Sequence, residues 1–132
     1  MVGRFLKKII AQNHEDIRVI SALCSEAKIK QSEVKFLKEN KIFLLFLERE
    51  NKEKNNSKEK INSILKFEFI KKSKSKNINQ NNDENILVLL AIDLFKKENN
   101  YEIILLFSNN GIITLDAEVM EVTLEDLRQI ND

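Results

Sequence analysis

Two short segments of the chain are apolar at every position. Residues 42–47 read Ile-Phe-Leu-Leu-Phe-Leu, and residues 86–92 read Ile-Leu-Val-Leu-Leu-Ala-Ile. In a β-strand successive side chains point to opposite faces, so each segment is predicted to be a strand that is apolar on both faces. Such strands lie at the centre of a sheet that is covered twice, or at an interface. The fold therefore needs a sheet that curves onto itself, a covering helix or a second chain.

One amphipathic helix is predicted over residues 14–27. Asn13 can cap its free N–H groups, and Glu15 and Asp16 in the first turn suit the helix dipole. Apolar residues then recur at helical spacing, namely Ile17, Ile20, Cys24 and Ala27, with Val19 and Leu23 beside them. This stripe gives the helix one face for a core.

Alternation of period two predicts the remaining strands. They are expected at 34–36, 65–69, 86–95, 101–107 and 113–119. Residues 38–41 read as a hairpin turn before the strand at 42–47. The strongest turn signal is Asn109-Asn110-Gly111, in which Asn110 and Gly111 are expected to supply the positive φ angles of a tight turn.

The alternation of the last strand slips by one residue. Inward positions run Ile113, Leu115, Ala117, Val119 and then Met120, Val122, Leu124. A slip within a strand predicts a β-bulge that bends it. Residues 124–130 are expected to close the chain as a short helical turn.

Two polar segments, 51–60 and 71–85, are predicted to be flexible loops because they consist almost entirely of charged residues, Asn and Ser. No boundary or internal repeat divides residues 1–132, so one domain is expected. The fold class predicted is α+β, a mostly antiparallel curved sheet or partly closed barrel. It has about six strands in meander-like order behind one N-terminal helix.

The net charge of +1 conceals an uneven distribution. Residues 1–82 hold 19 Lys and Arg against 10 Asp and Glu, whereas residues 83–132 hold 3 against 11. The two halves either form opposed charged patches that steer association or fold back on each other so that the charges mingle. The second arrangement is the one expected.

The composition predicts a cytoplasmic protein without a membrane segment. The longest apolar run has seven residues, far below the roughly 20 that cross a bilayer. The N-terminus is basic but has no sustained apolar stretch, so it does not read as a signal peptide. A lone Cys24 cannot form an internal disulfide.

Three segments resemble a small family of proteins of unknown function. They are Glu15–Ala22, Leu89–Ile92 and above all Gly111–Leu127, and taken in order they span nearly the whole chain. The family is domain of unknown function 2948, found chiefly in alphaproteobacteria. The Lys- and Asn-rich loops depart from its pattern, where relatives tend to carry Arg and aromatic residues. The resemblance implies one cytosolic bacterial domain and no assigned activity, so it transfers no catalytic residue.

Two residues invite comparison with catalytic nucleophile–base pairs. His14 is the only histidine, but its place at a helix start beside two acids is typical of a residue near a cap. Cys24 lies on the apolar stripe of the predicted helix, where a thiol acts as a small hydrophobe. No catalytic or cofactor-binding residue is predicted.

The acids near the C-terminus could in principle ligate a cation. Asp116, Glu118, Glu121, Glu125 and Asp126 lack the dense spacing and tight-turn glycine of a calcium loop, so they are interpreted as a solvated strand face and no metal site is predicted. Asp93 continues the face of Leu87, Leu89 and Ala91 and is expected to be partly buried, where an acid needs a partner.

Lys71-Lys72-Ser73-Lys74-Ser75-Lys76 is the only basic cluster. It has neither Arg nor a stacking aromatic, so at most weak, non-specific nucleic-acid binding is expected. With only Gly3 and Gly111, the chain cannot form a glycine-rich phosphate loop.

The leading functional hypothesis is a non-enzymatic binding or protein-interaction module that forms a homodimer. The strands at 42–47 and 86–92 carry more apolar surface than one helix can cover, which favours self-association. The alternative is a pocket protein or enzyme that takes a small ligand in the concavity between helix and sheet. A weak nucleic-acid binder is the third hypothesis.

Overall fold

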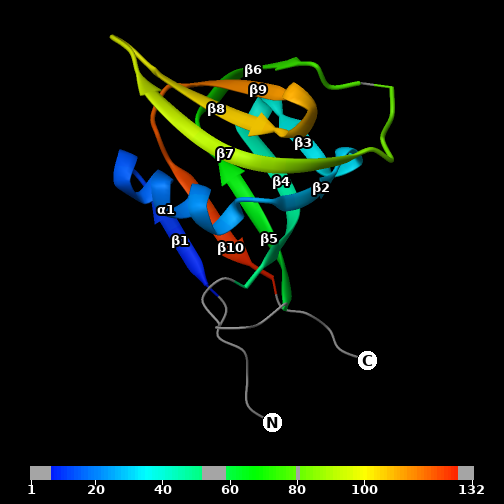
Figure 1. Ribbon diagram of the computed structural model, residues 1–132. Coiled ribbons are helices and arrows are strands. Elements are labelled where there is room, and N and C mark those ends of the chain that lie inside the picture. Colours follow the sequence, from blue (N-terminus) through cyan, green and yellow to red (C-terminus); the bar gives the residue numbers. More distant parts are fainter. Residues whose placement is uncertain (1–6, 52–58, 80, 128–132) are drawn as a thin grey trace.

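The fold is an open, ten-stranded antiparallel sheet that curves around one core (Figure 1). A computed structural model describes residues 7–51, 59–79 and 81–127. The described helices are α1 (His14–Cys24) and three short 3₁₀ turns, η1 (Gln31–Glu33), η2 (Lys38–Asn40) and η3 (Ser108–Asn110). The strands are β1 (Lys8–Ala11), β2 (Ala27–Lys30), β3 (Val34–Leu37), β4 (Ile42–Glu50), β5 (Lys60–Phe67), β6 (Ile70–Lys76), β7 (Ile86–Lys96), β8 (Tyr101–Phe107), β9 (Ile112–Ala117) and β10 (Val122–Asp126).

The strand order is β1-β10-β5-β4-β2-β7-β8-β9-β6, and β3 pairs with β4 beside β2. Every pairing is antiparallel, which confirms the predicted sheet type. The meander is only partial, because β1–β10, β10–β5, β2–β7 and β9–β6 join strands far apart in the sequence. The path ends at β1 and β6, so the sheet is not closed.

The helix begins where the sequence predicts. The Asn13 side chain accepts a hydrogen bond from the Asp16 backbone N–H at 2.8 Å, and Ile17, Ile20 and Cys24 face the core. α1 ends earlier than predicted because Glu26 adopts a positive φ of 69° and its N–H bonds to the Leu89 carbonyl at 2.6 Å. Ala27 then starts β2. In Figure 1 the helix lies beside β1 and against β7.

Six of the strands, β3, β4, β5, β7, β8 and β9, were predicted; β1, β2 and β6 were not, and β10 was predicted only as the continuation of the last strand past a bulge. The prediction of about six strands was therefore wrong in number. β1 and β2 have only four residues each, too few for a clear alternation. β6 occupies the first half of the segment predicted as a loop over 71–85. Of the loop predicted over 51–60, residues 52–58 lie outside the described part of the chain, and Lys60 already belongs to β5.

The slip in the last alternation is a change of strand rather than a bulge. β9 ends at Ala117 on the inward side, and β10 begins at Val122 with a different partner. Met120 is buried between them as predicted, but Val119 is half exposed and does not face inward. The helical turn predicted over 124–130 is wrong where the structure describes it, since Val122–Asp126 is a strand; residues 128–132 lie outside the described part.

The chain bends between β5 and β6 and again between β9 and β10, and these two bends are hydrogen-bonded to each other. β5 continues into β6 through Phe69, whose φ is 60°, and β9 continues into β10 through residues 118–121. Glu68 and Phe69 pair with this second bend through Glu68 N–H to Glu121 O at 3.0 Å and Glu118 N–H to Phe69 O at 2.9 Å. The bend carries β6 away from β5 to the far end of the sheet, beside β9.

Candidate functional site

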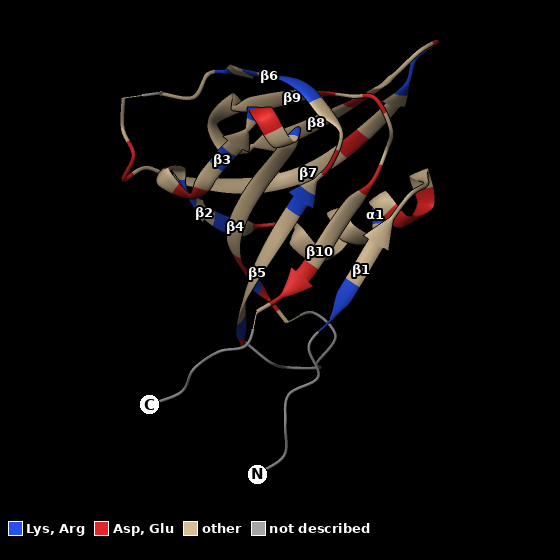
Figure 2. Cartoon of the chain, turned by 180° about the vertical axis from the view of Figure 1, so that it is seen from behind, with Lys and Arg blue, Asp and Glu red and all other residues tan. Residues whose placement is uncertain are grey.

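The basic cluster is an edge strand with two unlike faces. After a register shift at Lys71, Lys72, Lys74 and Lys76 alternate with Ser73 and Ser75, and Figure 2 shows basic residues coloured along β6. Ser73 lies opposite Leu115 and Ser75 opposite Ile113, both buried core residues of β9. Side chains of directly opposite residues share a face of the sheet, so the two serines lie on the inward face, where Ser73 is half-buried and Ser75 is exposed.

A cavity of about 360 Å³ lies where the sheet is open, between β3 and β6. Within the described part of the chain, β3 pairs with β4 alone and β6 pairs with β9 alone. The cavity is lined by Gln31, Ser32, Val34, Phe36, Phe43, Ser73, Ser75, Ile78, Asp83, Leu87 and Ile113. The cavity is therefore bounded by β3 and β6, each of which pairs on one side only, and it reaches the core strands β4, β7 and β9.

The connection between β6 and β7 bridges this opening on one side. η1 holds it through Ser32 N–H to the Asp83 carbonyl at 3.1 Å and Gln31 N–H to the Asn85 carbonyl at 2.8 Å. The Gln31 side-chain amide also donates to the Asn79 carbonyl. These bonds place Ile78 and Asp83 in the cavity wall.

The cavity combines an apolar floor with hydroxyl and amide groups. Phe36 and Phe43 pack with their ring centroids 6.1 Å apart, and Phe43 meets Phe67 edge-on at 6.2 Å. Polar atoms come from three serines and Gln31, with the carboxylate of the exposed Asp83. A volume of this size and mixed lining is typical of sites that take an apolar group carrying one or two hydrogen-bonding atoms.

The outer rim of the cavity is electropositive. Each ion pair found between described residues involves other cations, including Lys30, Lys41, Arg49 and Lys66. Lys71, Lys72, Lys74 and Lys76 have no carboxylate within ion-pair distance among those residues, although Lys72 lies across from Asp116 in the register. Four exposed, uncompensated charges on one strand attract anionic groups.

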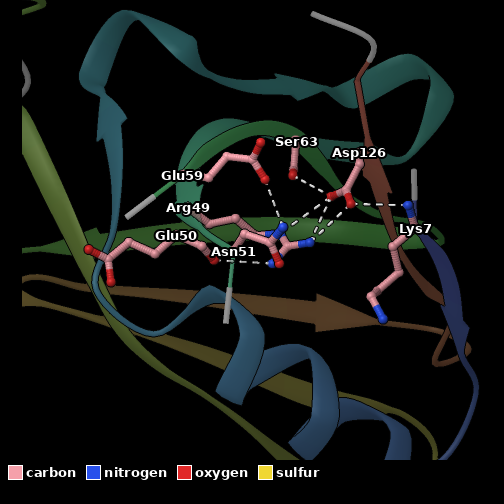
Figure 3. Close-up of polar contacts among 7 residues, drawn as sticks. All are labelled: Lys7, Arg49, Glu50, Asn51, Glu59, Ser63 and Asp126. Carbon is pink, nitrogen blue, oxygen red and sulfur yellow. Dashed lines mark hydrogen bonds and ion pairs between the residues drawn. The ribbon is translucent and has the colours of Figure 1, made fainter. Parts of the chain in front are cut away.

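A second polar cluster is buried at the other end of the sheet (Figure 3). The Arg49 guanidinium donates to both Asp126 carboxylate oxygens at 3.0–3.3 Å, and the two side chains are 0% and 1% exposed. Ser63 Oγ donates to Asp126 at 2.7 Å, and the Lys7 backbone N–H donates at 3.0 Å. The cluster ties β1, β4, β5 and β10 together, and its burial leaves no surface for a ligand.

The residues first considered for catalysis do not meet. His14 is exposed at the start of α1 and Cys24 is fully buried at its end, about 15 Å away along the helix axis. Asp93 is exposed rather than partly buried, because the extra residue Leu90 forms a bulge in β7 that moves the inward positions to Ile92 and Leu94.

The C-terminal acids also lie apart. Asp116 accepts from the Asn100 amide, Glu118 pairs with Lys41 at 3.1 Å, and Glu121 accepts from Gln12 at 2.9 Å. Asp126 is not on a solvated face, since it is buried on Arg49. Among residues 7–51, 59–79 and 81–127, no three His, Cys, Asp or Glu side chains gather as metal ligands would.

Sequence reasoning missed the two serines and Arg49. The signal for the serines was present, because Lys-Ser-Lys-Ser-Lys is a strict period-two pattern. The low complexity of the segment obscured this pattern. In addition, serine side chains do not identify the core-facing side of a strand as apolar side chains do. Arg49 follows Leu47 by two residues and continues the inward face of β4, so its burial was also readable from the alternation.

No helix in the described part of the chain has the length and apolar character needed to span a membrane. Neither the curated proteins nor the solved structures contain a match to this chain. A family of proteins does match it over residues 7–131, and its description is "Protein of unknown function (DUF2948)". Since the match spans all but seven of the 132 residues, the chain belongs to the DUF2948 family, as the resemblance in its helix and closing strands indicated.

Proposed function

We propose that this protein is a non-enzymatic cytosolic binding module whose ligand enters the cavity between β3 and β6. The observation that carries the proposal is the pair of serines at core-facing positions of β6, opposite Leu115 and Ile113. An aliphatic residue at the half-buried position 73 would extend the core, and Ser73 leaves this space open.

The hollow is a groove that opens to solvent, since Ser32, Ser75 and Asp83 in its lining are exposed. Filling such a space with methyl groups commonly stabilises a protein, so a retained cavity with polar groups is the default candidate for a binding site. The cavity lies at the opening of the sheet, not in the concavity under α1 where a ligand was first expected.

A binding role is favoured over catalysis by the residues near the cavity. Its walls contain serines, one amide and one carboxylate, but the histidine and the thiol of the chain lie on α1. A serine nucleophile needs an adjacent base, and Asp83 is an exposed carboxylate on a connecting segment.

The proposal is tested by titrating ¹⁵N-labelled protein with benzyl alcohol and with hexanol, each an apolar body bearing one hydroxyl. Saturable shifts are expected at the backbone amides of Ser73, Leu87 and Ile113, with a dissociation constant of about 1 mM for ligands this small. Ser73→Val should weaken these shifts, because it removes a hydroxyl group from the lining and adds one heavy atom that narrows the hollow. It should also raise the free energy of unfolding by up to about 1 kcal/mol.

Thr114→Val is the matched control. Thr114 lies on β9 next to the cavity strand but on the outer face, opposite Lys74, so its methyl group cannot enter the hollow. This variant should bind both alcohols as the parent protein does. Binding that Ser73→Val leaves unchanged, or shifts scattered over the surface, would show that the hollow is not the site.

Self-association remains a second candidate function because the outer face of β4 carries three apolar residues, Ile42, Leu44 and Phe46, with Ile64 of β5 beside them. We define the outer patch as Ile42, Leu44, Phe46 and Ile64, which are partly exposed and adjoin one another, with Phe46 directly opposite Ile64. Lys35 and Glu125 flank the patch on its two sides, and Lys66 lies opposite Leu44. A two-fold axis along the strands would set Lys35 of one copy near Glu125 of the other.

A further inference from the structure

The edge of β6 and the cavity beneath it together form a surface for an extended chain. β9 occupies one edge of β6, and alternate residues of an antiparallel strand direct their N–H and C=O groups toward the other edge. That edge turns toward β3, and at its start the Ile70 N–H bonds to the carbonyl of Lys41, the residue between η2 and β4, at 2.8 Å. Beyond that point the sheet is open.

The side chains of β6 define what an added strand must carry. Lys72, Lys74 and Lys76 repeat every two residues, about 6.8 Å apart, which is also the side-chain repeat of a bound strand. Residues of the ligand on the outer face would lie beside these lysines. Residues between them would point toward Ser73 and the apolar floor of the cavity.

We propose that the partner is an extended segment of another protein, acidic at alternate positions and apolar between them, that adds to the edge of β6 as a strand. Its backbone pairs with β6, its carboxylates face the lysine row, and its apolar side chains enter the cavity. The inference rests on the proposed function, since it names the ligand of the same cavity.

Two other occupants fit less well. Pairing of β6 with β6 of a second copy would set lysines against lysines, which is repulsive. A single-stranded nucleic acid could follow the charges, but it has no backbone groups to complete a strand edge, and β6 offers neither Arg nor an aromatic side chain for its bases.

The experiment uses a fluorescein-labelled nine-residue peptide of alternating glutamate and valine, followed by fluorescence anisotropy. The full-length chain should bind it more tightly than a lysine–valine peptide or an oligothymidine of equal charge. N-methylation of alternate backbone nitrogens on the edge facing β6 should abolish binding, because it removes the donors of the ladder. The triple variant Lys72→Glu, Lys74→Glu, Lys76→Glu should bind about tenfold or more weakly, since each exposed pair contributes a factor of roughly 1.4 to 5.

The matched control is Lys8→Glu, Lys28→Glu, Lys96→Glu, which makes the same change in net charge at exposed strand positions outside β6. It should bind nearly as the parent does. Equal loss in both triple variants, tighter binding of the oligothymidine, or indifference to N-methylation would each overturn the proposal. Benzyl alcohol binding distinguishes the cavity proposal from the strand-addition proposal. If the protein binds benzyl alcohol but not the peptide, the cavity is a binding site and the strand addition is wrong.

Discussion

At the scale of single residues, the strongest constraint on this fold is the buried pair of Arg49 and Asp126. Removing two charges from water costs several kcal/mol for each ion, so such a pair is tolerated only where every polar atom is satisfied. Here Ser63 and the Lys7 backbone complete the carboxylate, and Arg49 also donates to the Glu50 carbonyl at 3.3 Å. No buried side-chain polar atom of the described residues lacks a partner.

We expect Asp126→Ala to lower the free energy of unfolding by about 3–5 kcal/mol, because it leaves the Arg49 guanidinium buried without its counter-charge. Glu125→Ala, an exposed neighbour on β10, should change it by only about 0.5 kcal/mol. Urea denaturation of both variants measures the difference. Adding Arg49→Met to Asp126→Ala should recover part of the loss; equal effects at 125 and 126 would mean that the pair does not stabilise the fold.

In the turn before β9, the positive φ angles lie one residue earlier than the sequence predicts. Positive φ angles were expected at Asn110 and Gly111, but Asn109 and Asn110 carry them, at 61° and 63°, and Gly111 has a φ of −71°. Gly111 is constrained by space instead. A Cβ there would lie 3.3 Å from Ile78 Cγ1 and 3.3 Å from Phe107 Cβ.

Asn110→Val should therefore lower the free energy of unfolding by about 1–3 kcal/mol, since a β-branched residue is strained in the left-handed region. Asn110→Gly relieves that strain and should stay within about 1 kcal/mol of the parent. Thermal unfolding of the two variants decides the matter. A protein that tolerates valine at 110 as well as glycine would show that this turn does not hold the register of β8 and β9.

At the scale of elements, the cap of α1 adds to the stability that its apolar face provides. Asn13→Ala removes the acceptor for the Asp16 N–H and should cost about 0.5–2 kcal/mol. Arg18→Ala, on the exposed side of the same helix, should cost almost nothing because alanine is the better helix former. Denaturant unfolding checks both. If Arg18→Ala costs as much as Asn13→Ala, the end of the helix is stabilised by something other than its cap.

How far the sequence predicts the elements depends on the length and chemistry of each pattern. The helix and the alternating strand β9 were predictable because hydrophobic spacing marks an inward face, and β4 and β7 were predictable from their continuous apolar runs. β6 was not, since its inward residues are serines, and its partner β9 lies about forty residues along the chain. A cavity formed by edge strands that do not pair could not be derived from local patterns, because it depends on pairings distant in sequence.

At the scale of the whole molecule, the uneven charge of the two halves is resolved by interleaving. β6 of the basic half pairs with β9 of the acidic half, and β5 pairs with β10. The charges therefore mingle over most of the sheet, as expected, and Lys41 reaches Glu118 and Lys30 reaches Glu84. Along β6 no described carboxylate lies within ion-pair distance of the four lysines, so four uncompensated positive charges remain on one strand.

The outer patch leads to the last prediction. Ile42, Leu44, Phe46 and Ile64 are partly exposed on one face, and Leu37 and Ile10 nearby are 41% and 53% exposed. Apolar patches of this kind mark association sites, so light scattering should find a dimer at micromolar concentration. Phe46→Glu should make the protein monomeric without unfolding it, because its side chain already reaches solvent. Leu90→Glu, an exposed apolar position on β7, should leave the dimer intact. A parent protein that stays monomeric at about 100 μM, well above the dissociation constants of stable dimers, would rule out this interface and leave the cavity as the binding surface.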